Sequence, residues 1–568
     1  MSPRNFTAAQ VIESTLSGWL ALSYPNLDRR GLRSIASLAN DERITRFSDW
    51  LASLPFLNAA FWLSSAYARL AGDDTRRSRA LFFTPPDLSE RLILNLCANG
   101  APLATGRLID PACGGAAFLA PVAIRVRDEL KTAGVSPRRI LAHLEKHLFG
   151  IDIDPVLCRL CGMFLKMVLC SEILESGYKP KFKIQVANSL VALKDFSGKF
   201  DVVIGNPPYR KMPAEEVAYY RDSYAEVIGG QPNLYALFFA LGLRLLKRGG
   251  LAALVTPTSF LSGQYFSKLR SHLLLHSDTT QIDIVDERVG VFVGVEQETA
   301  VTLLKKRAPQ KIAPALTNVH VVSRTGRFES AGQCTLPNSG AAWPVPRTRD
   351  DMQVLQLFEA SAYRLVDYGY AARIGAFVWN RDKRAGFRAE KDARRRARAP
   401  FPLVWSRDIR PNGSFKFNRQ GGPDAHVFVD MQTTHSPSVI RRPCVALQRV
   451  TSSDQPRRLV AAPISQRFID RFGGFVGENH VVLVEPRVPS PPIAPQDLAK
   501  VLASLIVDRL FRCISGAANV SVFELEQLPL PDPQILSAQL RLSTDVDSVV
   551  ARAFELTRRR QMRGSRDG

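Results

Sequence analysis

A short apolar run followed by a stiff, proline-containing loop constrains the fold of this chain more than any other stretch. Residues 202–204 are Val-Val-Ile, and such a continuous apolar run is typical of a buried strand in a parallel sheet. Gly205 then ends the strand, and Asn-Pro-Pro-Tyr follows at residues 206–209. Each proline fixes its own φ and restricts the residue before it, so the loop is rigid. Because open α/β sheets bind ligands at the carboxyl ends of their strands, this loop is a candidate binding element.

The loop offers two hydrogen-bond acceptors and one flat ring. Asn206 has a side-chain carbonyl, and Pro207 has a backbone carbonyl and no N–H. Two fixed acceptors can hold both hydrogens of a planar NH2 group, and the ring of Tyr209 can stack on a flat π-system. The pattern therefore indicates an amino group on an aromatic ring as the target. A plain proline-rich turn after a strand would show the same four residues, so the neighbouring motifs must decide.

Three more strands are expected upstream, and each ends in polar or small residues. The first covers residues 108–110 and leads into a small-residue turn, the second covers residues 148–152, and the third covers residues 182–186. Carboxylates end the first two strands, and Asn188 and Ser189 follow the third. Because the tips of successive parallel strands lie along one edge of a sheet, these groups and the proline loop can share one cleft. The sequence therefore predicts an α/β fold with a doubly wound, Rossmann-like sheet.

A helix start is expected just before the first of these strands. Thr84 can cap the helix, and Pro85 or Pro86 can open its first turn. The free N–H groups of a helix start can bind a carboxylate, although the same residues would also cap an ordinary helix. Residues 1–80 have apolar residues at helical spacing and no chemical motif, so they are expected to form an N-terminal helical segment.

The composition indicates a cytoplasmic protein with a polyanionic partner. The 568 residues carry a formal net charge of +22, which favours nucleic acid over a membrane as that partner. No stretch reaches the apolar length of a spanning helix, and the amino terminus lacks the pattern of a signal peptide. The eight cysteines are scattered, which fits a reducing compartment. Cys158 and Cys161 lie in an apolar run with no second pair at zinc spacing, so no metal site is expected.

The character of the chain changes after residue 310. Residues 311–346 are rich in Pro, Ser, Gly and Thr, as in a linker, and residues 347–568 are expected to form a separate, mixed α+β domain. Between Arg373 and Arg419 there are 14 Lys or Arg against 4 Asp or Glu, with aromatic residues interleaved. Such a stretch fits contacts with DNA phosphates and bases, although it can also be a solvated charged surface.

The order of the motifs resembles that of the gamma-class N6-adenine DNA methyltransferases, the Asn-Pro-Pro-Tyr modification enzymes of bacterial type II restriction-modification systems. The residues that carry the resemblance are Phe-Thr-Pro at 83–85, Asp-Pro-Ala-Cys-Gly at 110–114, Gly-Ile-Asp-Ile-Asp-Pro at 150–155 and Asn-Pro-Pro-Tyr at 206–209. The resemblance implies an S-adenosylmethionine-binding catalytic domain over residues 81–310 and a DNA target-recognition domain over residues 347–568. It covers roughly residues 80–305 motif by motif and the rest more loosely.

The resemblance also implies a role for each motif residue in binding S-adenosyl-L-methionine. The implied cofactor-binding set, ordered from the amino-acid end to the adenine, is Thr84, Asp110, Ala112, Gly114, Asp152, Ile153, Asn188 and Ser189. Two positions depart from the family pattern. Asn188 stands where the family usually has Asp, and Ala116 stands where it often has Gly.

The implied catalytic set is Asn206, Pro207, Pro208 and Tyr209. By resemblance, Asn206 and Pro207 accept the hydrogens of N6 on an adenine that has flipped out of duplex DNA. Tyr209 stacks on the base, and Phe292 looks like the second aromatic residue that packs on it. The candidate DNA-binding residues of the carboxyl-terminal domain come from two sources. Arg394, Arg395, Arg396 and Arg398 belong to the basic stretch, and the resemblance to a target-recognition domain adds Arg449, Arg457 and Arg458.

Other acceptors and arrangements remain open. Methyltransferases that act on RNA or on a protein glutamine amide also use Asn-Pro-Pro-Tyr, but the Thr84 motif and the large basic domain favour DNA. N4 of cytosine is a further possible acceptor, and Tyr209 fits adenine better by resemblance. A fused nuclease is disfavoured because residues 1–80 are short, so the cognate restriction endonuclease is expected to be a separate chain.

Overall fold

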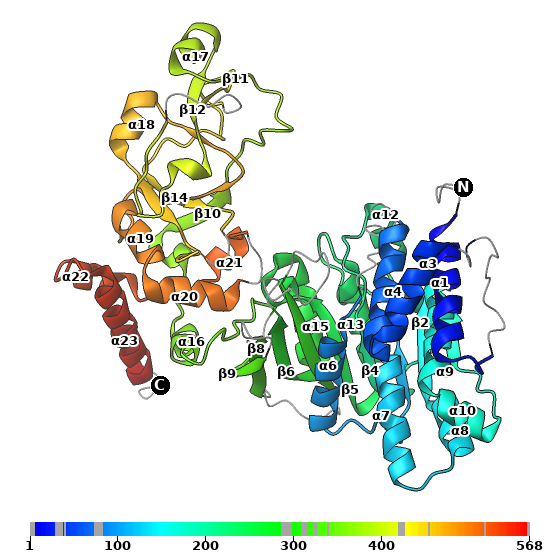
Figure 1. The fold of residues 1–568 in the computed structure, drawn as a ribbon. Helices are drawn as coiled ribbons and strands as arrows, with labels where there is room; N and C mark the ends of the chain where they lie inside the picture. Colours follow the sequence, from blue (N-terminus) through cyan, green and yellow to red (C-terminus); the bar gives the residue numbers. More distant parts are fainter. Residues whose placement is uncertain are drawn as a thin grey trace. The chain divides into compact units, whose positions relative to one another are not determined.

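The computed structural model of the chain forms two compact units (Figure 1). The described residues are 6–28, 38, 41–72, 83–194, 196–285, 298–307, 316–322, 327–337, 340–418, 426–451, 455–515 and 519–564. The first unit comprises Met1–Phe260, Tyr265–Ser330 and Asn338–Gly340, and the second comprises Leu261–Gln264, Ala331–Pro337 and Ala341–Gly568. No helix in the described ranges is long and apolar enough to cross a membrane.

A nine-stranded sheet with the order β3-β2-β1-β4-β5-β7-β6-β8-β9 forms the framework of the first unit, except that residues 331–335 of β9 belong to the second unit. Its strands are β1 Leu108–Asp110, β2 Leu148–Asp152, β3 Lys183–Val186, β4 Phe200–Gly205, β5 Leu246–Pro257, β6 Ser277–Val285, β7 Thr299–Lys306, β8 Leu316–Val322 and β9 Phe328–Thr335. The first five strands pair in parallel, whereas β7 runs antiparallel between β5 and β6. The predicted α/β, Rossmann-like fold is confirmed.

The four strands predicted from their tips are neighbours in this sheet. The apolar run Val-Val-Ile lies in β4, between β1 and β5, and its three side chains are buried. A strand that is apolar at every position suits a place in which both faces of the sheet are covered. Because β1 to β4 are parallel, their carboxyl ends lie at one edge, as the sequence predicts.

Helices connect and cover these strands. They are α1 Ala8–Ser23, α3 Glu42–Ser53, α4 Phe56–Leu70, α6 Pro86–Ala98, α7 Leu119–Thr132, α8 Pro137–His147, α9 Pro155–Val168, α10 Cys170–Ser176, α11 Ser189–Ala192, α12 Ala214–Tyr220, α13 Leu234–Leu245, α14 Ser259–Ser262 and α15 Ser267–His276. Their starts follow local chemistry. Asp154 caps α9 by accepting hydrogen bonds from the N–H groups of Val156 and Leu157, at 2.8 and 3.3 Å.

The N-terminal helices share one hydrophobic core with the sheet. The cluster that contains Leu16, Trp19 and Leu63 also contains Phe164 of α9. The rings of Trp19 and Phe164 meet edge to face, with centroids 6.0 Å apart. The described part of residues 1–80 is therefore helical, and it lies within the first compact unit rather than forming a unit of its own.

Residues 311–346, predicted to be a linker, contain two strands of the large sheet. β8 pairs in parallel with β6, and β9 follows it at the edge. Val319 and Val322 of β8 are buried, which gives this segment a place in the core despite its Pro, Ser, Gly and Thr content. Phe292 lies outside the described residues.

The second unit combines helices with two four-stranded sheets, in the orders β10-β17-β14-β15 and β11-β13-β12-β16. Its strands are β10 Tyr370–Ile374, β11 Gly386–Phe387, β12 Pro400–Val404, β13 Phe428–Asp430, β14 Cys444–Gln448, β15 Ala461–Ile464, β16 Val476–Gly477 and β17 Val481–Pro486. Its helices are α16 Asp351–Ala360, α17 Glu390–Arg396, α18 Gln466–Phe472, α19 Pro495–Leu502, α20 Leu505–Ile514, α21 Val522–Glu526, α22 Pro533–Leu540 and α23 Val546–Gly564. This content agrees with the predicted mixed α+β domain.

Candidate active site

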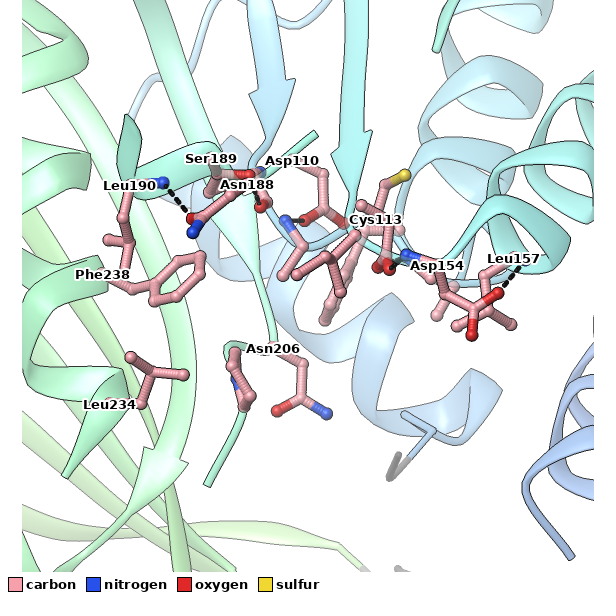
Figure 2. A pocket seen from close by; sticks show the side chains of 18 of the residues that line it. Asp110, Cys113, Asp154, Leu157, Asn188, Ser189, Leu190, Asn206, Leu234 and Phe238 are labelled. Carbon is pink, nitrogen blue, oxygen red and sulfur yellow. Dashed lines mark hydrogen bonds between the residues drawn. The ribbon is translucent and has the colours of Figure 1, made fainter. Parts of the chain in front are cut away.

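A pocket of about 190 Å³ lies at the carboxyl ends of the parallel strands (Figure 2). Ten residues singled out from the sequence line it: Thr84, Asp110, Ala112, Gly114, Asp152, Ile153, Asn188, Ser189, Asn206 and Pro208. The strand tips and the proline loop therefore meet in one cavity. Pro207 and Tyr209 belong to the same loop but do not line the cavity.

Asp110, at the end of β1, has a buried carboxyl group in which only one oxygen has a hydrogen-bond partner among the described residues. Its side chain is 1% exposed, and its Oδ1 accepts a hydrogen bond of 2.9 Å from the N–H of Ala112. Its Oδ2 is buried and has no hydrogen-bond partner among the described residues. Burial raises the pKa of Asp110 to about 8, and the nearby Asp152 carboxylate adds to the rise. An unpartnered buried carboxyl oxygen at a pocket wall suits a ligand that brings a donor or a positive charge.

The turn after β1 brings backbone close to the tip of β2. The N–H of Gly114 donates a hydrogen bond of 2.9 Å to Oδ2 of Asp152, and Gly114 has a φ of +47°. Oδ1 of Asp152 accepts from the N–H of Asp154, also at 2.9 Å. Both carboxylate oxygens are thus held, each with a further lone pair available to a ligand. Burial raises the pKa of Asp152 as well.

Helix α4 packs directly behind this turn. A Cβ at Gly115 would lie 2.2 Å from Oγ of Ser64, so only glycine fits that position without a shift. The Tyr67 hydroxyl donates a hydrogen bond of 2.9 Å to Oδ2 of the buried Asp154. Residues 1–80 carry no chemical motif, yet α4 braces the loops that hold Asp152. No sequence motif marks this contact, because it joins residues 87 positions apart.

Ala116 occupies a backbone conformation that favours glycine. Its φ is +60°, and its side chain is buried. The left-handed region costs a residue with a Cβ about 1–2 kcal/mol. The family resemblance led us to expect a glycine here, and the backbone shows the physical reason for that preference.

Asn188, which follows β3, has a side-chain amide whose oxygen and nitrogen both form hydrogen bonds. Oδ1 of Asn188 accepts from the N–H of Leu190 at 3.1 Å, which caps α11 (Figure 2). Its Nδ2 donates to the hydroxyl oxygen of Tyr220 at 2.7 Å. Oγ of Ser189 donates to the carbonyl of Pro111 at 2.5 Å, which ties the tip of β3 to that of β1.

The proline loop places Asn206 opposite Thr84. Nδ2 of Asn206 donates to Oγ1 of Thr84 at 3.0 Å, so residue 84 and the loop are in contact. The prediction that Thr84 caps the helix is wrong, because α6 begins at Pro86, its N-cap residue is Pro85, and no side chain caps it. The Tyr209 hydroxyl donates to Oδ1 of Asn206 and lies 3.1 Å from the carbonyl oxygen of Val255. The ring of Tyr209 packs edge to face on Tyr235, with centroids 6.4 Å apart. In this state the Tyr209 ring lies against protein rather than in the pocket.

Several pocket residues were not found from the sequence. Leu234 and Phe238 extend from α13, and Figure 2 shows the Phe238 ring between Asn188 and Asn206. The sequence of α13 is apolar all round, so its pocket face looks no different from its core face. Arg210 directly follows the loop and forms a double hydrogen bond with Glu216, both at 2.8 Å. The position of Arg210 next to the loop is the one sequence feature from which its place in the pocket could have been predicted.

The DNA-binding residues expected in the second unit divide into exposed and buried groups. Arg394 to Arg396 on α17 and Arg398 after it are exposed, and Arg394 pairs with Glu390 at 2.8 Å. Arg449 and Arg457 are half-buried, and a guanidinium nitrogen of Arg449 donates to the carbonyl of Asn479 at 2.9 Å.

Arg458 differs from the other six. Its side chain is only 5% exposed, its N–H donates to Asp508 at 2.6 Å, and its guanidinium donates to Ser515 at 3.3 Å. The prediction of a DNA contact from Arg458 is therefore not supported, because a buried guanidinium has no face for a phosphate. Adjacent arginines in the sequence, Arg457 and Arg458, point to different environments along an irregular segment.

The described residues contain no group of three or more His, Cys, Asp or Glu side chains placed to hold a metal ion. The chain thus has a cavity at the carboxyl ends of parallel strands with a carboxylate at each of the first two tips, which is where open α/β sheets bind their ligands.

Known proteins with similar sequences are restriction-modification methyltransferases. Residues 146–292 match the Eco57I restriction-modification methylase family. The chain is 30% identical over 157 residues to type II methyltransferase M.PstI of Providencia stuartii, covering 27% of this chain and 30% of that protein. It is 25% identical over 235 residues to type II methyltransferase M.PaeR7I of Pseudomonas aeruginosa, covering 40% of each. The chain thus spans well under half the length of these curated relatives.

The fold likeness extends further along the chain than the sequence likeness. The solved structure of the type IIL restriction-modification enzyme MmeI in complex with DNA matches with a TM-score of 0.56 and 10% identity. The match covers 96% of this chain and 86% of that one. At this identity the likeness concerns the fold alone.

Proposed function

We propose that this protein is a site-specific DNA methyltransferase of a restriction-modification system, which transfers a methyl group from S-adenosylmethionine to N6 of adenine in duplex DNA. One observation carries the proposal: Asp110, Asp152 and Asn206 line the same pocket. Direct transfer needs donor and acceptor atoms held about 3–3.5 Å apart, so a cofactor site and an amine site must adjoin. The matched family and the type II methyltransferases among the relatives support methyl transfer in a restriction-modification system.

The strand-tip residues fit S-adenosylmethionine. The unpartnered Oδ2 of Asp110 suits the ammonium group of the amino-acid end, because a charge-assisted hydrogen bond would satisfy it. The remaining lone pairs of Asp152 suit ribose hydroxyls. The side chain of Ile153 is 63% exposed and can pack on a purine ring, which would cover its apolar surface. Asn188 and Ser189 would then meet the adenine edge.

Within this proposal the chain itself mainly positions the target amine. S-adenosylmethionine supplies a methyl group that is already activated as a sulfonium. Oδ1 of Asn206 and the carbonyl of Pro207 would accept the two N6 hydrogens and stabilise the positive charge that develops on nitrogen. Because the Tyr209 hydroxyl donates to Oδ1 of Asn206, the incoming amine must compete with that hydroxyl for this oxygen. Pro208 already lines the pocket, and we propose that Tyr209 and Phe292 contact the base as well, for which the Tyr209 ring must leave its packing on Tyr235.

DNA is the polyanion that we propose for the excess positive charge of the chain, +22 in all. The target base must leave the stack, which costs a few kcal/mol and requires contacts on both sides of it. The exposed arginines of α17 are candidates for phosphate contacts in the second unit. A separate restriction endonuclease with the same site specificity is the further partner that we propose.

The test is direct identification of the methylated nucleoside. Purified protein is incubated with duplex DNA and S-adenosylmethionine carrying a labelled methyl group, and the DNA is digested to nucleosides and separated. The expected product is N6-methyldeoxyadenosine. Label on N4 of cytosine, on RNA or on a protein glutamine in parallel reactions, with none on adenine, would contradict the proposal.

A further inference from the structure

Asn188 and Tyr220 form a pair at the pocket wall that motif reasoning did not connect. Asn188 comes from the tip of β3, and Tyr220 comes from the last turn of α12, 32 residues later. Both side chains line the pocket, and Tyr220 is 8% exposed. The hydrogen bond between them, at 2.7 Å, has a direction that the surrounding groups determine.

The orientation of the Asn188 amide follows from its backbone partner. The N–H of Leu190 can only donate, so the atom that faces it must be the amide oxygen of Asn188. The NH2 group therefore faces Tyr220. An amide nitrogen has no acceptor capacity, so the Tyr220 oxygen must accept this hydrogen bond and its own hydrogen must point elsewhere.

No described residue accepts the hydrogen of the Tyr220 hydroxyl, and the Tyr220 side chain lines the pocket. Burial raises the pKa of Tyr220, so the hydroxyl stays protonated at neutral pH. The hydroxyl of the neighbouring Tyr224, by contrast, donates its hydrogen inside the protein. Tyr224 is fully buried, and its hydroxyl donates to the carbonyl of Leu190 at 2.9 Å, which is a purely internal contact.

We infer that Tyr220 is a cofactor-binding residue whose hydroxyl donates a hydrogen bond to a ring nitrogen of the cofactor's adenine. This inference rests on the proposed function, since it takes S-adenosylmethionine as the ligand of the pocket. The adenine ring offers acceptor nitrogens, and the second lone pair of the Asn188 oxygen can accept from the exocyclic amine. Tyr220 would thus donate to an acceptor nitrogen of the adenine, and Asn188 would accept from the amine of the same base.

The inference gives the asparagine at position 188 a specific consequence. A carboxylate there would accept the Tyr220 hydrogen and remove it from the pocket, because a carboxylate has no hydrogen to donate. The amide instead donates to Tyr220 and leaves that hydrogen available to a ligand. With Asn instead of Asp at position 188, the Tyr220 hydroxyl is therefore free to donate to the adenine ring, and no hydrogen bond to the adenine is lost.

The test compares binding of S-adenosylhomocysteine with that of its 1-deaza, 3-deaza and 7-deaza adenine analogues, each of which replaces one ring nitrogen by C–H. Calorimetry on the full chain gives the dissociation constants. One analogue should bind the wild-type protein roughly five- to tenfold more weakly than S-adenosylhomocysteine, the usual effect of one lost hydrogen bond. Tyr220→Phe should abolish that difference and leave the ranking of the other two analogues unchanged.

Two further variants make the result specific. Tyr219→Phe is the matched control, because Tyr219 is the adjacent tyrosine, is 67% exposed and does not line the pocket. It should retain the wild-type ranking. Asn188→Asp should abolish the same analogue difference as Tyr220→Phe although Tyr220 is intact, and it tests the inference should Tyr220→Phe fail to fold.

Two outcomes would overturn the inference, and they can be told apart. A wild-type chain that binds S-adenosylhomocysteine, together with a Tyr220→Phe or Asn188→Asp variant that keeps the wild-type analogue ranking, would refute the role of Tyr220 alone. A folded wild-type chain that binds none of the four ligands would refute the proposed cofactor, and this inference with it.

Discussion

The pocket of the first unit and the basic segment of the second unit differ in how well sequence reasoning located their residues. Every cofactor-type residue taken from a strand tip lines one cavity. The candidate arginines of the second unit lie in different environments. Those on and after α17 (Figure 1) are exposed, whereas Arg458 is buried.

The cause of this difference is physical. Parallel strands must end at one edge of their sheet, so a residue just after a strand has only one region to occupy. Charge fixes no position, because a guanidinium can contact solvent, a carboxylate or a backbone carbonyl with little change in the sequence around it. Motifs tied to strand ends therefore place residues, whereas charge counts only indicate a kind of partner.

The largest effect is expected at the pocket, from Asn206→Ala. Under the proposed function this change removes a positioned acceptor for the N6 hydrogens, so the methylation rate should fall roughly 100-fold or more. Binding to duplex DNA should change little, because the phosphate contacts remain. Rates with labelled cofactor and gel-shift affinities separate the two quantities. Asn58→Ala, on the exposed side of α4, is the matched control, and a variant that methylates DNA normally would refute the role of Asn206.

Asp110→Asn should weaken cofactor binding and stabilise the ligand-free protein at the same time. Because the pKa of Asp110 is about 8 in the folded chain and near 4 in the unfolded chain, the folded chain binds the extra proton between these values. The wild-type carboxyl therefore lowers the free energy of unfolding as pH rises from about 4 to about 8. An amide lacks this titration and keeps the acceptor for the N–H of Ala112.

Urea unfolding of the ligand-free proteins at several pH values measures this effect. The midpoint for Asp110→Asn should exceed that of the wild type at pH 8 and approach it near pH 4. Loss of a charge-assisted hydrogen bond should at the same time weaken S-adenosylhomocysteine binding roughly tenfold or more. Unfolding midpoints that differ by a constant amount at every pH would show that Asp110 is not the titrating group.

A smaller effect is expected from the basic segment. Replacing Arg395 and Arg396 by Gln should lower the salt dependence of DNA binding by about 2 in the log–log slope, if both neutralise phosphates. Gln replacement of Arg558 and Arg559, which are exposed on α23, removes the same charge elsewhere and serves as the control. Equal changes in slope for both double variants would show that α17 has no special role and that only the net charge matters.

The fold and most of the pocket could be predicted because they follow from local rules. A continuous apolar run gave the central strand β4, and residues at strand ends gave the cavity. The contact of Tyr67 with Asp154 and the pocket face of Phe238 could not be predicted, because each depends on packing between distant segments that carry no motif. The strands β8 and β9 were missed since their segment has the composition of a loop.

The smallest effect should come from Ala116→Gly, at the one position where the turn after β1 departs from the expected glycine pattern. Glycine relieves a φ of +60°, worth about 1 kcal/mol, but it removes a buried methyl worth about 0.8 kcal/mol and adds freedom to the unfolded chain. These contributions nearly cancel, so the free energy of unfolding should change by less than about 1 kcal/mol. Gly115→Ala, one residue earlier, should lower the free energy of unfolding more, because its Cβ would lie 2.2 Å from Oγ of Ser64 and, after that hydroxyl turns away, would still lie 3.2 Å from Cβ of Ser64. Urea unfolding of the two variants measures this contrast. A large loss of stability in Ala116→Gly would mean that the methyl group, rather than the backbone, determines the turn.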